Sequence, residues 1–225
     1  MCDKDSKLSV ISIFGMIQDG VTELLGSLEL DGCTIKKKYG IVWVFVRNNV
    51  KITSYPEWME ECEVRSFISQ ITPVKMIINT EIISGKGSAV RSSLEACLID
   101  HGGMRIRRMT DIGADKLETH DPLPGLEFDR FPRAETEPVR TSKIGSTTVD
   151  MVGHMNNVEY VRYILDSYGS HDFDVRPVSR MDVHYIGQAY EGETIDLCRN
   201  SDGNADYVTV KREGKIVTEC IIERF

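Results

Sequence analysis

The amino-acid sequence predicts an α+β fold that is built twice, each time as one antiparallel sheet wrapped around one helix. Two observations support this prediction. Both halves of the chain contain a helix-like apolar repeat that is followed by a series of alternating, β-rich segments. A proline-rich, acidic stretch separates the halves. A lone helix with a run of antiparallel strands is typical of a layered α+β domain.

The composition is that of a globular protein. The chain has 225 residues, of which 41% are hydrophobic and 28% are charged, far from a disordered composition. This length indicates one or two domains. The formal net charge of −8 argues against a protein that binds nucleic acid with its whole surface, because such a surface is basic.

The cysteines and the N-terminal residues indicate a soluble protein of the cytoplasm. Six cysteines are scattered singly, without a C-x-x-C pair or a Cys/His cluster at zinc spacing, so we expect reduced thiols and no metal site. Residues 1–8 are polar and unlike a signal peptide. The longest apolar run, residues 41–46, is far shorter than the ~20 residues that span a bilayer. No glycine-rich nucleotide loop occurs, and we expect no cofactor.

The first half, residues 1–111, is expected to form one unit. Residues 7–14 resemble a short strand. Residues 15–30 follow with apolar side chains at helical spacing, and Asp31-Gly32 is expected to end this helix. Alternating or apolar β-rich segments then predict the strands of a sheet: 41–52, 61–69, 73–83 and 88–100, with 104–109 as a candidate last strand.

Residues 112–138 are predicted to be a solvated linker. The stretch 112–137 contains seven acidic and three basic residues, a local net charge of −4, which is half of the formal charge of the chain. Three of the seven prolines lie in it, and a fourth, Pro138, follows directly. Such a composition is typical of a segment that connects two units.

The second half, residues 139–225, repeats the order of the first. A strand is expected at 139–146 and a helix at 156–168. The strands that follow are predicted at 178–187, 193–199, 205–212 and 215–225. The chain therefore repeats an architecture more than a sequence.

The most informative window is residues 150–160, just before and into this second helix. Gly153 lets the backbone approach a ligand carbonyl, and free N–H groups at a helix N-terminus can hold a developing oxyanion. Asp150 is placed to activate a water or to attack directly, and His154 to donate to the substrate or to orient water. These are the parts that acyl transfer needs.

The same residues also have a purely structural interpretation. Asp150 and Asn156 are of the types preferred as helix caps, and His154 can be a hydrogen-bonded structural histidine. Spacing alone does not decide between the two interpretations, because a short acid-Gly-His string is not rare.

A family resemblance favours the catalytic interpretation. The window resembles the D-x-x-G-H-x-N-N-x-x-Y signature of hotdog-fold thioesterases, which is matched at Asp150, Gly153, His154, Asn156, Asn157 and Tyr160. The two tandem units resemble the fatty acyl-ACP thioesterases, and residues 43–65 and 91–100 are similar to that family's first sheet. The resemblance implies a double hotdog fold that hydrolyses fatty acyl-ACP to free fatty acid and holo-ACP in fatty acid biosynthesis.

The chain departs from that family at positions near the motif. The family usually has Asn where this chain has Val152, and Glu, sometimes followed by Cys, where it has Gln188 and Ala189. Gln188 can orient a water by hydrogen bonding but cannot act as a base. Whether an acid such as Glu191 or Glu193 takes that place is left open by the sequence.

The matched positions carry over with the following expected roles. Asp150 is the base or the nucleophile, and His154 is a positioning group. Gly153 and the neighbouring helix amides are the expected oxyanion donors, and Asn156 and Asn157 open the helix of the active half. The first half lacks the motif and is expected to supply the acyl-chain pocket or its core, with Ile17, Val21, Leu24 and Leu28.

Acyl carrier protein is strongly acidic, so the resemblance implies a local basic dock. Two clusters are candidates, and their members are Lys36, Lys37, Lys38 and Arg105, Arg107, Arg108. An acyl-CoA thioesterase and a non-catalytic protein that binds acyl chains or acyl-ACP stay open as alternatives, and a hydratase is disfavoured because the window does not resemble a hydratase motif. Both a monomer and a homodimer are compatible with a tandem fold.

Overall fold

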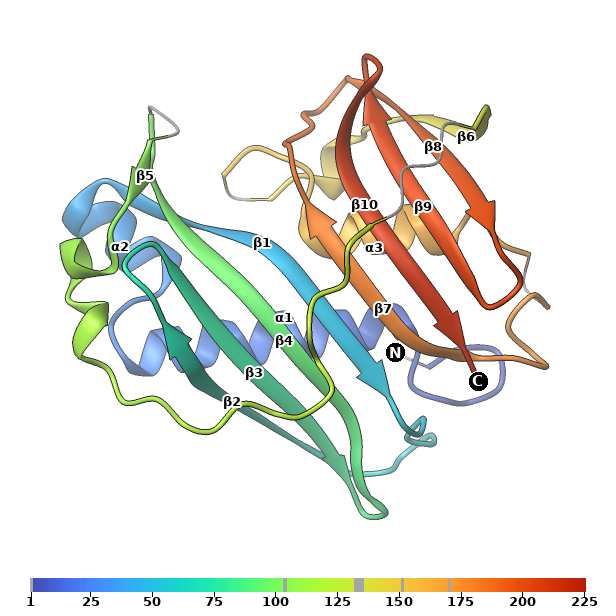
Figure 1. Ribbon diagram of the computed structural model, residues 1–225, viewed down its shortest axis with the longest axis horizontal. Helices are drawn as coiled ribbons and strands as arrows, with labels where there is room; N and C mark the ends of the chain where they lie inside the picture. The colour runs from blue at the N-terminus through green and yellow to red at the C-terminus, as the bar shows by residue number, and fades with distance from the viewer. Residues whose placement is uncertain (1, 103–104, 132–135, 151, 170) are drawn as a thin grey trace. The chain divides into compact units, whose positions relative to one another are not determined.

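The computed structural model describes the chain except for residues 1, 103–104, 132–135, 151 and 170. The chain forms two compact units, Met1–Glu127 and Phe128–Phe225 (Figure 1). None of the helices in the described ranges is long and apolar enough to cross a membrane.

The first helix of unit 1, α1, spans Val10–Ser27. The side chain of Ser9 accepts a hydrogen bond from the N–H of Ser12 at 3.2 Å, which is an N-cap. The predicted strand at 7–14 is therefore wrong over most of its length. Its apolar run forms the first turns of a buried helix face, whose members are Ile13, Phe14, Ile17, Val21 and Leu25.

A second helix that the sequence did not predict, α2, spans Gly32–Tyr39. The carboxylate of Asp31 accepts the N–H groups of Cys33 and Thr34, both at 3.0 Å, so this residue starts a helix as well as following one. Gly40, at φ +67°, ends α2. The three consecutive lysines lie in the last turn, where the helix dipole favours cations.

The sheet of unit 1 is antiparallel, with β2, β3, β4 and β1 side by side in that order and a short β5 paired with β4. Its strands are β1 Ile41–Ile52, β2 Cys62–Ile71, β3 Lys75–Ser84, β4 Gly87–Asp100 and β5 Ile106–Arg107. Each corresponds to a predicted strand. Helix α1 crosses one face of this sheet and packs mainly on β2 and β3 (Figure 1). Gly20 permits this approach, because a β-carbon there would lie 2.8 Å from side-chain atoms of Ser66 and Val64.

The first part of the predicted linker is packed on unit 1. Two short 3₁₀ helices, η1 Met109–Ile112 and η2 Ala114–Lys116, bury apolar side chains in the core. Further along, the N–H of Leu123 donates to Oδ1 of Asn79 at 3.0 Å, and Nδ2 of Asn49 donates to the carbonyl of Glu127 at 2.7 Å. Residues 112–127 thus belong to unit 1 and residues 128–138 to unit 2. The acidic composition of this stretch hid buried residues such as Leu126.

Unit 2 contains one helix, α3 Asn157–Leu165, among its described residues, and five antiparallel strands. The strands lie in the order β7-β10-β9-β8-β6. Their bounds are β6 Pro138–Lys143, β7 Val178–Tyr185, β8 Thr194–Ser201, β9 Ala205–Arg212 and β10 Lys215–Arg224, with a 3₁₀ turn η3 at Ser146–Thr148. The hydroxyl of Tyr163 joins α3 to the sheet by donating to the carbonyl of Ile195 at 3.0 Å. The α+β class predicted from the sequence is confirmed for each unit.

Candidate active site

The motif loop of unit 2 is organised around one carboxylate oxygen. Oδ1 of Asp150 accepts the backbone N–H groups of Val152 at 2.8 Å, Gly153 at 3.1 Å and His154 at 3.4 Å. Oδ2 of the same carboxylate has no hydrogen-bond partner among the described residues. The carboxylate is 27% exposed, so one oxygen holds the loop and the other is left for a ligand.

The backbone of the loop is closed by hydrogen bonds between its ends. The N–H of Asp150 donates to the carbonyl of His154 at 2.9 Å, and the N–H of Gly153 donates to the carbonyl of Asp150 at 3.0 Å. Gly153 has φ +95°, a conformation that L side chains rarely adopt. The glycine of the motif is therefore required by the turn itself.

His154 lies beside Asp150, with 3.8 Å between its Nδ1 and Oδ1 of the carboxylate. This distance is too long for a hydrogen bond but short enough for an electrostatic interaction when the imidazole is protonated. The ring of His154 makes an edge contact with Tyr190, with centroids 6.0 Å apart. The expected closeness of Asp150 and His154 is present in the structure.

The amides near the helix start differ in their availability. The sequence suggested Gly153 as an oxyanion donor. In this conformation its N–H already donates to Asp150 and is not free to hold an oxyanion. The side chain of Asn156 accepts from the N–H of Val158 at 2.9 Å and is the N-cap of α3, the structural role considered for it. The N–H of Asn157, in the first turn of α3, has no acceptor in the described part of the chain and is the better oxyanion donor.

Gln188 directly precedes a residue that is hydrogen-bonded to the motif loop. The carbonyl of Ala189 accepts the N–H of Met155 at 2.8 Å. The hydroxyl of Tyr190 donates to Oε1 of Gln188 at 2.9 Å. Sequence reasoning missed Tyr190, which only its place in the loop after β7 reveals.

Of the two acids that the sequence left open, Glu193 has a structural role in the loop between β7 and β8. Glu193 accepts the N–H of Tyr190 at 2.8 Å and pairs with Nη1 of Arg212 at 3.1 Å. The same Nη1 donates to the carbonyl of Gln188 at 2.7 Å. Glu193 therefore stabilises the loop that carries Gln188.

Buried phenols lie behind the motif. Burial raises the pKa of Tyr160 and Tyr185 above the usual value of 10.0, so both stay protonated. The hydroxyl of Tyr185 donates to the carbonyl of Asn157 at 3.3 Å. The last position of the motif, Tyr160, is thus part of the core that holds the start of α3.

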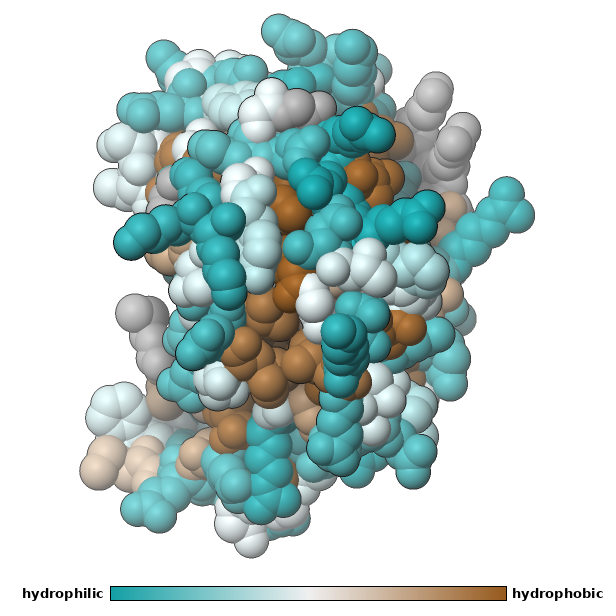
Figure 2. All heavy atoms as spheres, turned by 90° about the vertical axis from the view of Figure 1, so that its left-hand side faces the viewer, coloured by the Kyte–Doolittle hydropathy of each residue, from teal (hydrophilic) through white to brown (hydrophobic). Residues whose placement is uncertain are grey.

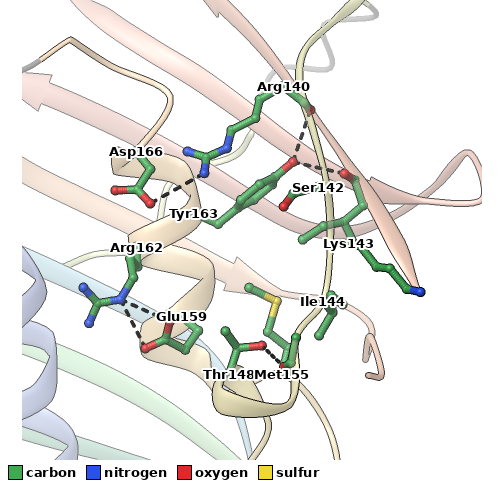
Figure 3. Close-up of a pocket in the computed structure, with 12 residues that line it drawn as sticks. Arg140, Ser142, Lys143, Ile144, Thr148, Met155, Glu159, Arg162, Tyr163 and Asp166 are labelled. Carbon is green, nitrogen blue, oxygen red and sulfur yellow. Dashed lines mark hydrogen bonds and ion pairs between the residues drawn. The ribbon is translucent and has the colours of Figure 1, made fainter. Parts of the chain in front are cut away.

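A pocket of about 140 Å³ lies between β6 and α3, on the side of the motif loop where Thr148 and Met155 lie (Figure 3). Two ion pairs lie among its lining residues: Arg162 bonds to Glu159 at 3.1 Å, and Arg140 lies 3.6 Å from Asp166. The described side chains that line it include neither Asp150 nor His154. We therefore do not assign the pocket to the acyl thioester.

The candidate residues of unit 1 fall into two groups. Ile17 and Val21 are fully buried in the core, and Leu24 and Leu28 are partly buried against it. Of the basic residues, Arg107 is paired with Asp100 and Asp111, whereas no ion pair joins the others to an acid in the described ranges. Figure 2 shows the side of unit 1 on which α2 lies in Figure 1, where hydrophilic side chains surround an apolar centre. In the described ranges no group of three or more His, Cys, Asp or Glu is arranged to hold a metal ion.

Comparison with known proteins connects this geometry to one family. Residues 134–223 match the family model of the acyl-ACP thioesterase C-terminal domain. The chain is 22% identical over 182 residues to oleoyl-acyl carrier protein thioesterase 2 of Arabidopsis thaliana. The matched region covers 74% of this chain and 49% of the relative. It is also 22% identical over 174 residues to a palmitoyl-acyl carrier protein thioesterase of Cuphea hookeriana, covering 73% and 40%. The chain thus spans about half the length of the curated relatives that it matches.

Solved structures share the fold over the whole chain. An acyl-ACP thioesterase from Bacteroides thetaiotaomicron superposes with a TM-score of 0.91 at 16% identity, covering 99% of this chain and 92% of the other. The 12:0-ACP thioesterase from Umbellularia californica superposes with a TM-score of 0.87 at 15% identity, covering 100% and 92%. The predicted tandem hotdog fold is confirmed. Together, these findings show that residues 134–223 are similar to the C-terminal domain of acyl-ACP thioesterases and that the chain has the fold of solved acyl-ACP thioesterases.

Proposed function

We propose that the protein is a thioester hydrolase that cleaves fatty acyl-ACP to free fatty acid and holo-ACP, in fatty acid synthesis. The observation that carries this proposal is that the two oxygens of the Asp150 carboxylate have different surroundings. Oδ1 holds the motif loop through backbone N–H groups, and Oδ2 is left to react. A carboxylate fixed in this way is pre-oriented as a general base.

The reaction follows from this geometry. Oδ2 of Asp150 removes a proton from a water, whose oxygen attacks the thioester carbonyl carbon. The electron pair of the C=O bond moves to the oxygen, where the N–H of Asn157 at the positive end of α3 stabilises it. The C–S bond then breaks and the C=O bond forms again. The thiolate of the carrier leaves and receives the proton that Asp150 took from the water. His154, 3.8 Å from the carboxylate, positions these groups.

The proposed carrier is acyl carrier protein, which would dock on α2 and the β5 region. Lys37 and Lys38 are exposed in the last turn of α2. Arg105 and Arg108 flank β5 on the same unit and are exposed, and no ion pair joins their guanidinium groups to an acid in the described ranges. Arg107 contributes less, since Asp100 and Asp111 neutralise it. The six cysteines are all free thiols, which supports a reducing compartment such as the cytoplasm.

The central experiment measures thiol release from a panel of acyl-ACPs and acyl-CoAs with wild type and Asp150→Asn. Asparagine keeps an oxygen acceptor for the loop N–H groups and removes the charged Oδ2. We expect a loss of at least about 10²-fold in kcat, as for removal of a general base, with an unchanged melting temperature. Asp150→Ala, which removes the loop acceptor as well, is the comparison that separates chemistry from folding.

Other outcomes of the same panel identify the alternatives. Faster release from acyl-CoA than from every acyl-ACP would indicate an acyl-CoA thioesterase. A stable acyl-ACP complex without release of thiol would indicate a non-catalytic binding protein, an alternative motivated by Val152, Gln188 and Ala189, which depart from the residues that the family resemblance implies. Equal activity of wild type and Asp150→Asn would contradict the proposed mechanism.

The docking surface is tested by charge reversal. Lys37→Glu is expected to raise KM for acyl-ACP about threefold at low salt and to leave KM for acyl-CoA unchanged, because a rim charge acts mainly on association with an acidic partner. Lys215→Glu, an exposed lysine at the start of β10, is the matched control. An equal effect of both variants would show that only net charge matters.

A further inference from the structure

The loop between β7 and β8 carries the amide side chain of Gln188 at a position where the family resemblance implied an acid. The hydrogen bonds of this amide determine which groups it can bind. We propose that Gln188 donates a hydrogen bond from Nε2 to the carbonyl oxygen of the thioester, and that Tyr190 is a positioning residue that holds the amide in this orientation. This inference rests on the proposed hydrolysis and names two residues that shape it.

The loop lies directly along the motif. The carbonyl of Ala189 accepts the N–H of Met155 at 2.8 Å, and the ring of Tyr190 makes an edge contact with the ring of His154. Gln188, which precedes Ala189, is therefore held beside the residues that flank Asp150. The residue as a whole is partly buried, and the hydrogen bond that its amide makes with Tyr190 is exposed.

The orientation of the Gln188 amide follows from Tyr190. The phenol hydroxyl donates to Oε1 at 2.9 Å, which occupies the acceptor side of the amide. The two N–H groups of Nε2 have no acceptor among the described residues. A group that offers only N–H donors cannot take a proton from water, but it suits an oxygen on which negative charge develops.

The backbone around this pair is fixed by a charged network. Arg212 donates to the carbonyl of Gln188 at 2.7 Å and to Glu193 at 3.1 Å, and Glu193 accepts the N–H of Tyr190 at 2.8 Å. Both ends of the Gln188–Tyr190 segment are thereby held. Pre-orientation of this kind is what makes a donor effective, because no reorganisation is needed when charge appears.

In the proposed step, the water oxygen forms a bond to the carbonyl carbon while the C=O electron pair moves to the oxygen. The N–H of Asn157 and Nε2 of Gln188 donate to that oxygen, and no covalent bond to Gln188 forms. When the C–S bond breaks, the electron pair returns and both hydrogen bonds weaken. The chain would thus use Gln188 as a second oxyanion donor beside Asn157.

The decisive variant is Gln188→Glu, for which the two roles predict opposite signs. If Gln188 is a donor, an ionised Glu repels the developing oxyanion, and kcat falls about 10²-fold at pH 7.5, the size of a lost oxyanion donor. Activity relative to wild type then recovers as the pH falls and the carboxyl becomes protonated, because a protonated carboxyl can donate. If the position needs a base, Gln188→Glu equals or exceeds wild type at pH 7.5, and the proposal is overturned.

The positioning role is tested by Tyr190→Phe. In the wild-type background we expect Tyr190→Phe to lower kcat about tenfold with KM unchanged. In the Gln188→Ala background we expect Tyr190→Phe to lower kcat no further than Gln188→Ala alone does, because the hydroxyl acts through the amide. Tyr207→Phe is the matched control, since its hydroxyl donates at 2.9 Å to the exposed Asp202 in a distant turn of the same unit. An equal loss from Tyr190→Phe with and without Gln188 would assign Tyr190 a merely structural role and overturn the proposal.

The activity of the wild type distinguishes failure of the proposed function from failure of the inference about Gln188. A wild type that releases no thiol from any substrate would overturn the proposed function and this inference together. A wild type that is active, sensitive to Asp150→Asn and insensitive to Gln188→Glu would overturn this inference alone.

Discussion

Gly20 of α1 and Ser66 of β2 are so close that a β-carbon on Gly20 would lie 2.8 Å from Oγ of Ser66 and from Cγ1 of Val64. Glycine in a helix costs about 0.5–1 kcal/mol relative to alanine. This cost is accepted here because α1 could not otherwise approach β2. Gly15, in the same helix, has no atom within 4 Å of the corresponding position.

The two glycines predict opposite effects of one substitution. Gly20→Ala is expected to destabilise the protein by about 1 kcal/mol, since overpacking costs about 1–3 kcal/mol and exceeds the gain in helix propensity. Gly15→Ala is expected to stabilise it by about 0.5–1 kcal/mol. Urea unfolding midpoints measure both. Stabilisation by Gly20→Ala would show that the packing of α1 on β2 is looser than the structure has it.

The amide of Asn79 holds the segment that leads out of unit 1. It accepts the N–H of Leu123 and donates to the carbonyl of Ser92 at 3.1 Å, and it is 1% exposed. Asn79→Ala leaves both backbone groups without this partner, and we expect a loss of about 1–3 kcal/mol in the free energy of unfolding. Gln70→Ala, at an exposed amide on β2, is expected to change it by less than about 0.5 kcal/mol. Similar losses from both would contradict the prediction.

The turn of the motif loop depends on Gly153. A β-carbon at this position would meet no atom within 4 Å, but the φ of +95° disfavours any L side chain. Gly153→Ala therefore introduces backbone strain of about 1–3 kcal/mol and no clash. We expect kcat to fall and hydrogen exchange of the neighbouring amides to accelerate. Gly145→Ala is the control, because Gly145 has φ −93° and equally open surroundings. Full activity of Gly153→Ala would mean that the loop does not need this turn.

The stability of α2 should depend on pH through Asp31. Hydrogen bonds from Thr34, and then from Cys33, hold the pKa of this carboxyl below its usual value of 3.8. A carboxyl with a lowered pKa in the folded state stabilises the protein above its unfolded pKa, and this contribution is lost as the pH falls through the folded value. Asp31→Asn keeps a capping oxygen without a titrating group.

We therefore expect the difference in unfolding free energy between wild type and Asp31→Asn to be constant above about pH 5 and to change in favour of the variant below about pH 4. Urea unfolding at a series of pH values measures it. Parallel curves down to the lowest pH would show that the hydrogen bonds of Asp31 do not distinguish its two protonation states.

Strands were easier to predict than helix ends in this chain. Alternation located every long strand, because one sheet face is buried and the period of two is regular. Residues 10–14 misled the prediction, since a β-branched run fits a buried helix face as well as a strand. The decisive signal was the cap at Ser9, whose hydrogen bond to Ser12 is local but not periodic. Asp31-Gly32 was similarly interpreted only as the end of the first helix, although Asp31 is also the N-cap of α2.

The sequence named candidate residues of the site but not the hydrogen bonds between them. The motif placed Asp150 and His154 side by side, as the structure has them. No pattern could show that the N–H of Gly153 is consumed by the Asp150 carboxylate, or that Tyr190 bonds to Gln188, because both depend on the folded path of two loops. The charge pattern also misassigned residues 112–127, whose apolar members are too widely spaced to form a recognisable period.

The packing of residues 109–127 on unit 1 has a consequence for synthesis on the ribosome. The central strands of this unit are complete once residue 100 has left the exit tunnel, yet Ile112 and Ala114 belong to its core and Leu123 to its hydrogen bonds. Nascent chains that stop between residues 100 and 127 would therefore expose part of the core. We expect such chains to engage chaperones, and the engagement to end when Glu127 emerges, before any strand of unit 2 has been made.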